Sequence, residues 1–179
     1  MRILGVDPGT IKCGYGIIDL APGGKLLLVH FGLVNLASLP GIPQKLECIY
    51  SALSEQITKY HPNEFSIETA FYGKNVQSAL KIGLARGAAI LAARHHQLGI
   101  SEYSPREIKK AVVGNGAASK EQVMFMVKTL LSSTIELRLD ESDAIAAALC
   151  HAFRFRQGGE TKQKSWKTFI DNFPERVIK

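Results

Sequence analysis

Four acidic residues stand where secondary-structure elements are expected to begin or end. Asp7 closes the short branched segment 2–7, and Glu68 closes a second apolar segment, 65–68. Asp140 and Asp143 are three residues apart at the start of an Ala-rich segment, a spacing that places both on one face of a helix. Singly, most have a structural explanation, because Asp7 can be a turn residue and the Asp140 pair can cap a helix.

Together, the four carboxylates favour a metal site. Glu68 ends a Phe-Ser-Ile-Glu strand, and a carboxylate at such a place in a compact fold is costly without a partner. Carboxylate oxygens are hard ligands suited to Mg²⁺ or Mn²⁺, and like charges this close require a cation or protonation. Two divalent ions about 4 Å apart can activate water and stabilise the leaving oxygen of a phosphodiester. The four acids therefore predict metal-dependent phosphodiester hydrolysis.

Five segments with strand-like composition must position these acids. They are residues 2–7, 14–20, 26–34, 65–68 and 100–103. The first three follow one another with short turns, so we expect an antiparallel meander. The fourth strand would lie beside the first if the intervening helix crosses over, which would bring Glu68 next to Asp7 at one edge of the sheet.

Apolar residues at helical spacing predict the elements that cover this sheet. The expected helices are 46–60, an Ala-rich helix over 76–97 broken by two glycines (Gly83 and Gly87), a short helix starting at Pro105, 119–131 and 140–155. Ser119-Lys-Glu-Gln122 is a capping-box pattern that opens the fourth of them. The fold class is therefore α/β, with a five-stranded mixed sheet covered by helices on both faces.

The basic residues are concentrated in the middle of the chain. The whole chain carries a net charge of +6, and residues 70–120 hold eight Lys or Arg against two Asp or Glu, also +6. The segments on either side, 1–69 and 121–153, are net acidic at −1 and −3. A basic segment between two acidic ones suggests a polyanion held against the carboxylates, although a solvated basic face would look similar.

Length and composition set the outer limits. At 179 residues the chain fits one domain, which we place at 1–156, followed by a tail at 157–179. The tail carries an apolar i, i+3, i+4, i+7 pattern starting at Trp166, so both disorder and docking remain open. No stretch approaches about 18 consecutive apolar residues, so no membrane span is expected. Asp7 stands where a signal peptide needs its apolar stretch, which makes the cytoplasm the expected compartment.

Several stretches of this sequence resemble the RuvC family of crossover junction endodeoxyribonucleases, which resolve Holliday junctions. The matching stretches are Leu4-Gly-Val-Asp-Pro-Gly-Thr10, Gly14-Tyr-Gly16, Ile67-Glu-Thr-Ala-Phe-Tyr-Gly-Lys-Asn75, Ser78-Ala-Leu-Lys-Ile-Gly-Leu-Ala-Arg-Gly87, Ile108-Lys-Lys-Ala-Val-Val-Gly-Asn-Gly116 and Asp140-Glu-Ser-Asp-Ala144. They run in order to about residue 153, and the tail has no counterpart.

The resemblance implies a ribonuclease H-like fold and a homodimer that makes paired, symmetric nicks in strands of like polarity during recombination and repair, leaving 5′-phosphates. It makes Asp7, Glu68, Asp140 and Asp143 the catalytic, metal-binding residues, with two Mg²⁺ ions per site and Mn²⁺ as a substitute. It also implies a set of DNA-binding residues: Phe71, Lys74, Asn75, Lys81, Lys109 and Lys120. Phe71 would stack on bases, although it could also be a core residue. The family also works with RuvA and RuvB, a partner that nothing in the sequence shows independently.

Three other functions fit parts of the pattern. The turn after Asp7, Asp-Pro-Gly-Thr, is similar to phosphate loops of actin-like kinases, but that architecture duplicates its core domain and this chain has room for one. A nuclease of the same fold acting on RNA or on other branched nucleic acid is a second alternative. The third is a module that binds junctions without cutting them.

Overall fold

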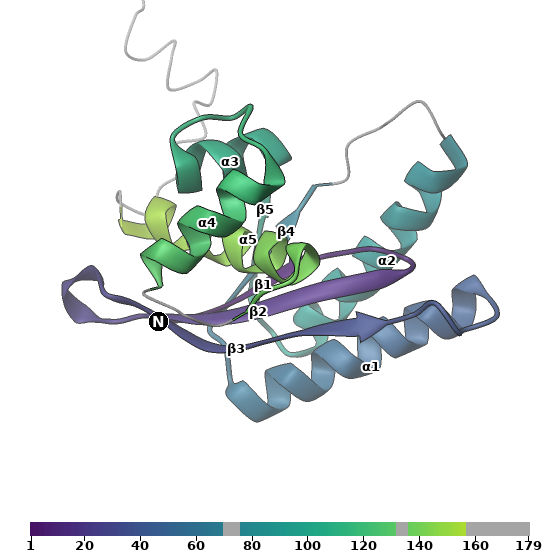
Figure 1. Ribbon diagram of the computed structural model, residues 1–179. Helices are drawn as coiled ribbons and strands as arrows, with labels where there is room; N and C mark the ends of the chain where they lie inside the picture. Colours follow the sequence, from purple (N-terminus) through teal and green to yellow (C-terminus); the bar gives the residue numbers. More distant parts are fainter. Residues whose placement is uncertain (70–75, 132–135, 157–179) are drawn as a thin grey trace, which may run out of the picture.

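The computed structural model describes residues 1–69, 76–131 and 136–156, in which five strands and five α-helices lie (Figure 1). The strands are β1 (Arg2–Asp7), β2 (Lys12–Leu20), β3 (Leu26–Asn35), β4 (Glu64–Glu68) and β5 (Gly99–Tyr103). The helices are α1 (Ile42–Tyr60), α2 (Val76–His95), α3 (Pro105–Val113), α4 (Lys120–Leu130) and α5 (Leu139–Arg156), and a short 3-10 turn, η1 (Pro22–Gly24), joins β2 to β3. The expected tail, 157–179, lies outside the described residues.

The strands form one mixed sheet in the order β3-β2-β1-β4-β5. β1 to β3 are the predicted antiparallel meander, while β4 runs parallel to β1 with Val6 opposite Ile67. Asp7 and Glu68 each follow that last pair by one residue, so both lie at the same edge of the sheet. The predicted crossover is therefore confirmed.

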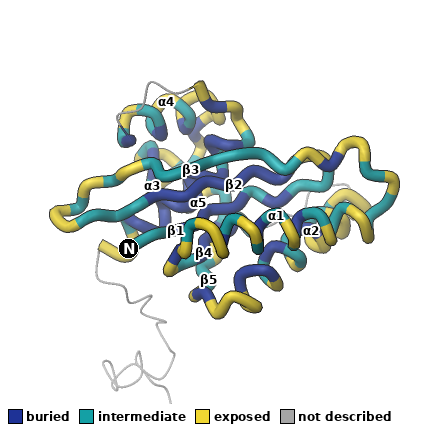
Figure 2. Tube along the Cα trace, turned by 90° about the horizontal axis from the view of Figure 1, so that it is seen from below, coloured by how far each residue is buried: buried dark blue, intermediate teal, exposed yellow. Residues whose placement is uncertain are grey.

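Each face of the sheet carries its own layer of helices and its own hydrophobic core (Figures 1 and 2). Side chains of successive strand residues point to opposite faces, and β1 divides accordingly: Ile3 packs in the core with α3, α4 and α5, whereas Leu4 and Val6 pack in the core with α1 and α2. The acids of β1 and β4 are thus held at the end of a sheet that is buried on both sides.

Helix α5 lies directly on the centre of the sheet because the residue beneath it has no side chain. A Cβ built on Gly5 would stand 2.1 Å from the carbonyl oxygen of Ala144 and 2.7 Å from the backbone nitrogen of Ala148. The buried hydroxyl of Ser66, on β4, donates to the carbonyl of Ala147 at 2.7 Å. This close approach sets the height of α5 above the sheet, and with it the position of the acids in its first turn.

Two details of the sequence-based expectation need correction. Helix α2 is continuous, so the expected break at Gly83 and Gly87 is wrong; nothing lies within 4 Å of a Cβ built on either glycine, and neither is forced out of helical geometry. Strand β2 begins at Lys12 rather than at residue 14, because pairing with β3 extends to Lys12 opposite Asn35. The earlier start places a lysine at the edge of the sheet where Asp7 ends.

Candidate active site

The four predicted acids converge on one edge of the sheet from three elements. Asp7 ends β1 opposite Gly14 of β2, and Glu68 ends the adjacent strand β4. Gly14 packs against the first turn of α5, since a Cβ built on it would stand 2.2 Å from the carbonyl oxygen of Asp140. Asp143 follows one turn later on the same helix. The contact at Gly14 therefore seats the α5 acids beside Asp7.

This convergence places the two strand acids, Asp7 and Glu68, in a buried site close to other negative charges. Burial, together with the charges of Asp143 and Asp140, raises the pKa of Asp7 to about 6. Burial and the charges of Asp7 and Asp143 raise the pKa of Glu68 to about 7, while Lys120 and Lys109 act in the opposite direction. These shifts arise because carboxylates near one another in a partly dry site disfavour each other's charge. A bound cation would relieve the repulsion.

Each of the two acids of α5 forms an ion pair with a lysine. Lys120, the first residue of α4, donates to the Asp143 carboxylate at 2.5 Å, and Lys12 Nζ lies 3.8 Å from Asp140 Oδ2. Burial alone would lower the pKa of Lys120, but its hydrogen bond to Asp143 and the surrounding negative charge raise it instead. Lys12 lies outside the basic middle of the sequence and was not predicted; the signal available was its place two residues before Gly14 on the same strand.

No three His, Cys, Asp or Glu side chains among the described residues stand close enough together to enclose a metal ion as they are. At this edge Asp140 and Asp143 are each paired with a lysine. The donor set still fits a hard divalent cation: four carboxylates, all within electrostatic reach of Asp7 or Glu68.

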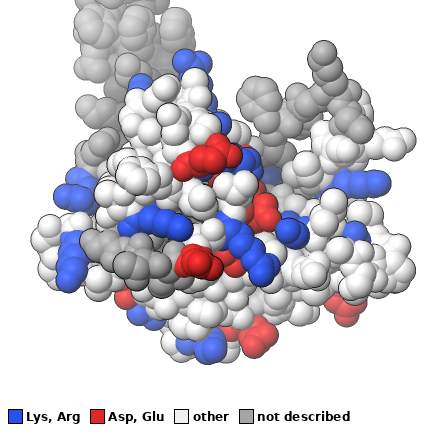
Figure 3. Space-filling view, in the orientation of Figure 1, with Lys and Arg blue, Asp and Glu red and all other residues white. Residues whose placement is uncertain are grey.

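The DNA-binding residues expected from the sequence divide into two groups. Lys109 and Lys120 lie on α3 and α4 above the acids, and both act on the pKa of Glu68. Lys81 is an exposed residue of α2. Three others lie outside the described residues, namely Phe71, Lys74 and Asn75. On the face seen in Figure 3, basic side chains surround several acidic ones, an arrangement suited to a phosphate backbone approaching a carboxylate site.

Two arginines of the predicted basic middle serve the fold rather than the site. Arg86 forms an ion pair with Glu102, which joins α2 to β5. Arg94 donates to the carbonyl of Leu98 at 3.4 Å. The charge count therefore overstated how many cations in this segment are available to a polyanion.

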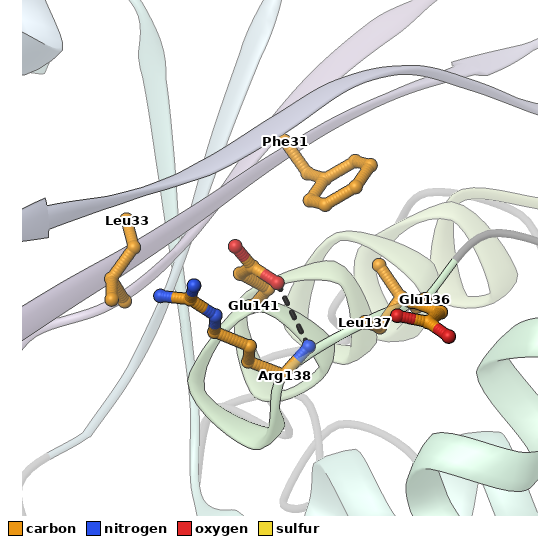
Figure 4. A pocket seen from close by; sticks show the side chains of 6 residues that line it. All are labelled: Phe31, Leu33, Glu136, Leu137, Arg138 and Glu141. Carbon is orange, nitrogen blue, oxygen red and sulfur yellow. Dashed lines mark hydrogen bonds between the residues drawn. The ribbon is translucent and has the colours of Figure 1, made fainter.

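A cavity of about 510 Å³ lies near the acids but is not lined by them (Figure 4). Its wall consists of Phe31, Leu33, Glu136, Leu137, Arg138 and Glu141. Glu141 is directed into it from α5 and accepts a hydrogen bond from the Arg138 backbone N–H at 2.8 Å, which caps the start of that helix. Arg138 and Glu141, which lie close to Asp140 in the sequence, thus stabilise the start of α5.

The metal-free protein should become less stable as the pH rises. A carboxyl group whose pKa is raised by folding contributes stability that is present below its unfolded pKa, roughly 4, and is lost as the pH rises through its folded value. For Asp7 and Glu68 the folded values are about 6 and about 7. We expect Glu68→Gln to be more stable than the wild type at pH 8 in EDTA, by on the order of 2 kcal/mol, and the difference to shrink toward pH 4.

Urea unfolding at both pH values measures this difference, with Glu64→Gln as control because Glu64 lies at the opposite end of β4. Mg²⁺ should stabilise the wild type at pH 8 and have less effect on Glu68→Gln, since a ligand that binds the folded state stabilises it. A wild type and Glu68→Gln with parallel pH profiles would contradict the assignment of the repulsion to this site.

Comparisons with known proteins converge on one family. The family model described as "Crossover junction endodeoxyribonuclease RuvC" matches residues 3–151. A curated protein of that name from Chloroherpeton thalassium is 44% identical over 187 residues, which covers 100% of both chains, so the expectation that the tail at 157–179 has no counterpart is wrong. Another from Dehalococcoides mccartyi is 48% identical over 152 residues, which covers 84% of this chain and 90% of its own. All four acids fall inside the matched region.

Solved structures give the same result. The RuvC of Thermus thermophilus superposes with a TM-score of 0.81 at 30% identity, covering 89% of this chain and 98% of that one. The same protein in complex with a Holliday junction substrate superposes with a TM-score of 0.80 at 27% identity, with the same coverage of both chains. The yeast mitochondrial Holliday junction resolvase Ydc2, at 16% identity and a TM-score of 0.62, shares the fold. The expected ribonuclease H-like fold is thereby confirmed.

Proposed function

The chain belongs to the RuvC family of crossover junction endodeoxyribonucleases, and we propose that its catalytic centre consists of Asp7, Glu68, Asp140 and Asp143. As a Holliday junction resolvase, it hydrolyses phosphodiesters at four-way DNA junctions. The observation that carries the assignment of the site is the convergence of four carboxylates from β1, β4 and α5, with two of their pKa values raised by burial and mutual repulsion.

The four carboxylates would hold Mg²⁺, with two ions per site and Mn²⁺ as a substitute. When bound, these ions supply a water nucleophile at neutral pH and stabilise the negative charge that develops on the leaving oxygen. The oxygen-only donor set supports a hard cation over zinc. The repulsion that raises the pKa of Asp7 and of Glu68 supports a multiply charged one.

The chain's own cations would hold the scissile strand over these acids. Lys109 and Lys120 face the site from the helical layer above it, and the charge of each acts to lower the pKa of Glu68. Lys81, together with Lys74, Asn75 and the aromatic Phe71, would extend this contact along α2 and the segment before it. Phosphate contacts fix the register of a strand without reading its sequence, which suits recognition of a branched structure.

A substrate panel tests the proposed activity. Synthetic four-way junction, linear duplex and RNA–DNA hybrid are incubated with the protein in Mg²⁺, in Mn²⁺ and in EDTA. We expect symmetric nicks with 5′-phosphate ends in the junction alone, and none in EDTA. Preferred cleavage of the hybrid would indicate a nuclease acting on RNA, whereas tight binding of intact junction in Mg²⁺ would indicate a module that does not cut.

The exposed face of α2 supports a homodimer. Val76, Leu80, Leu84 and Leu91 recur at helical spacing and are 49–70% exposed, which is unusual for leucine and valine. Gly83 lies between them with nothing within 4 Å of a built Cβ, so a second backbone could approach closely. By length and composition α2 could also cross a membrane, and 22% of its most apolar window is buried, so most of this apolar surface is open to a partner. A second copy would cover this face without a bilayer.

Breaking this face should produce monomers. We expect Leu84→Glu to weaken self-association at least about thirtyfold, because it would place an unpaired charge at an apolar contact. Sedimentation velocity over a concentration series measures the change. Leu27→Glu, at an exposed position on β3, is the matched control and should stay dimeric. The monomer should leave singly nicked junctions; coordinated paired nicks from a monomeric variant would contradict the proposal.

Two further proposals rest on family membership alone. We propose a RuvA–RuvB branch-migration complex as the partner that presents the junction, and the cytoplasm as the compartment, because the curated relatives are bacterial proteins that act on DNA. Co-purification with both partners on junction DNA tests the first of these.

A further inference from the structure

Lys12 is held at the edge of the active site by the geometry of β2. Strand residues two apart share a face, and Gly14 and Gly16 both face α5, since Cβ atoms built on them would meet Asp140 and Ile145. Lys12 therefore extends toward α5 from the position before them, and its Nζ lies 3.8 Å from Asp140 Oδ2. Its side chain is 48% exposed, so the ammonium group lies at the surface beside the acids.

The turn that precedes Lys12 is anchored from the opposite face. Lys45, on α1, donates from Nζ to the carbonyl of Thr10 at 2.8 Å. The backbone N–H of Leu36 donates to the carbonyl of Ile11 at 2.9 Å. Because the backbones of both residues before Lys12 are fixed, the Cα atom of Lys12 has a defined position. Its side chain can therefore reach only a limited region, which includes Asp140.

The two lysines at the site approach from different layers. Lys120 reaches Asp143 from α4, in the helical layer, while Lys12 reaches Asp140 from the sheet. Lys120 already belongs to the expected DNA contacts, which leaves the sheet side of the acids without an assigned cation. A strand lying across the acids would have phosphates on both sides of the scissile bond. Lys12 is placed to meet the one nearest β2.

We infer that Lys12 is a positioning residue with two alternative partners, Asp140 in the metal-free protein and a backbone phosphate in the loaded one. The inference rests on the proposed function, in which Asp140 is a metal ligand. Asp140 would hold a divalent ion through the same carboxylate that Lys12 now contacts, and Lys12 would then be free to leave it. The freed ammonium then holds the DNA strand on the sheet side of the site.

The first test measures metal binding without DNA. Calorimetric titration with Mn²⁺ compares wild type, Lys12→Met and Lys12→Arg, with Lys25→Met as the control lysine because residue 25 follows η1 at the far end of the sheet. We expect Lys12→Met to bind Mn²⁺ about two- to fivefold more tightly than wild type, the range expected when an exposed ion pair no longer competes. Lys12→Arg and Lys25→Met should match the wild type.

The second test measures junction binding in Ca²⁺, an oxygen-preferring cation used in place of Mg²⁺. Lys12→Met should bind the junction more weakly, and the slope of log affinity against log salt should fall by about one for each phosphate that the variant no longer neutralises. Lys12→Arg should restore the affinity. Replacing a lysine with a purely structural role would not raise metal affinity while lowering DNA affinity.

The outcomes separate this inference from the proposed function. Wild type that binds no Mn²⁺ overturns both. Wild type that binds Mn²⁺ and cuts junctions, with Lys12→Met unchanged in metal affinity and salt slope, overturns the role of Lys12 alone. Opposite shifts in metal and junction affinity support it.

Discussion

Asp7→Asn is expected to abolish junction cleavage, with a loss of more than about 100-fold, while leaving junction affinity within a few-fold of wild type. Loss of groups that only support a metal's ligands already lowers activity about 10- to 100-fold, and Asp7 would be a ligand itself. Burial, and after it the charges of Asp143 and Asp140, raise its pKa to about 6. The substitution removes charge from the site without changing side-chain size. Single-turnover cleavage in Mg²⁺ beside an electrophoretic binding assay measures both quantities.

Asp19→Asn is the matched control for this substitution. Asp19 lies at the opposite end of β2, where its hydrogen bonds with Arg2 lower its pKa. It should retain cleavage at close to the wild-type rate. Cleavage by Asp7→Asn at the wild-type rate would contradict a catalytic metal site at Asp7. Equal losses in both variants would indicate a general effect of altered charge on folding.

Gly5→Ala is expected to destabilise the protein by about 3 kcal/mol or more, at the upper end of the range for overpacked cores. The added methyl group would meet backbone atoms of α5 at Ala144 and Ala148, and backbone cannot rotate away as a side chain can. Helix α5 must then rise from the sheet, which also moves Asp140 and Asp143 away from Asp7. Urea unfolding measures the free-energy loss, and junction cleavage reports the displaced acids.

Gly99→Ala separates this clash from the general effect of replacing a strand glycine. A Cβ on Gly99 would meet the carboxylate of Glu64, the far end of a flexible side chain, at 2.6 Å. Its effect should stay within about 1 kcal/mol of wild type, the span of strand propensities. Comparable losses from the two substitutions would show that α5 is not held at its height by Gly5.

The fold was predictable because local and long-range patterns agree. Short branched segments closed by Asp-Pro-Gly or by a carboxylate specify the strands, and the rule for crossovers places β4 beside β1. The ends of elements were harder, because they depend on tertiary pairing: β2 starts at Lys12 only because Asn35 of β3 lies opposite. Helix α2 runs through Gly83 and Gly87 because a glycine inside a helix costs only about 1 kcal/mol relative to alanine, which is too little to end a helix of this length.

The candidate site was predictable as a set of acids but not as an arrangement. Sequence spacing and topology bring Asp7, Glu68 and the α5 pair to one edge. They carry no information about which cations meet those acids, because Lys12 and Lys120 lie more than 100 residues apart and are joined only through α5. The net charge counted Arg86 as available to a polyanion, but Arg86 forms an ion pair with Glu102.

The position of bound metal decides whether the four acids form a metal site. Crystals soaked in Mn²⁺ and measured at the manganese absorption edge would locate the ions by anomalous scattering. We predict two peaks, each about 2 Å from carboxylate oxygens of Asp7, Glu68, Asp140 or Asp143, with Lys12 turned away from Asp140. Manganese bound elsewhere, with both lysines still paired to α5 at saturating concentrations, would contradict the four-acid metal site.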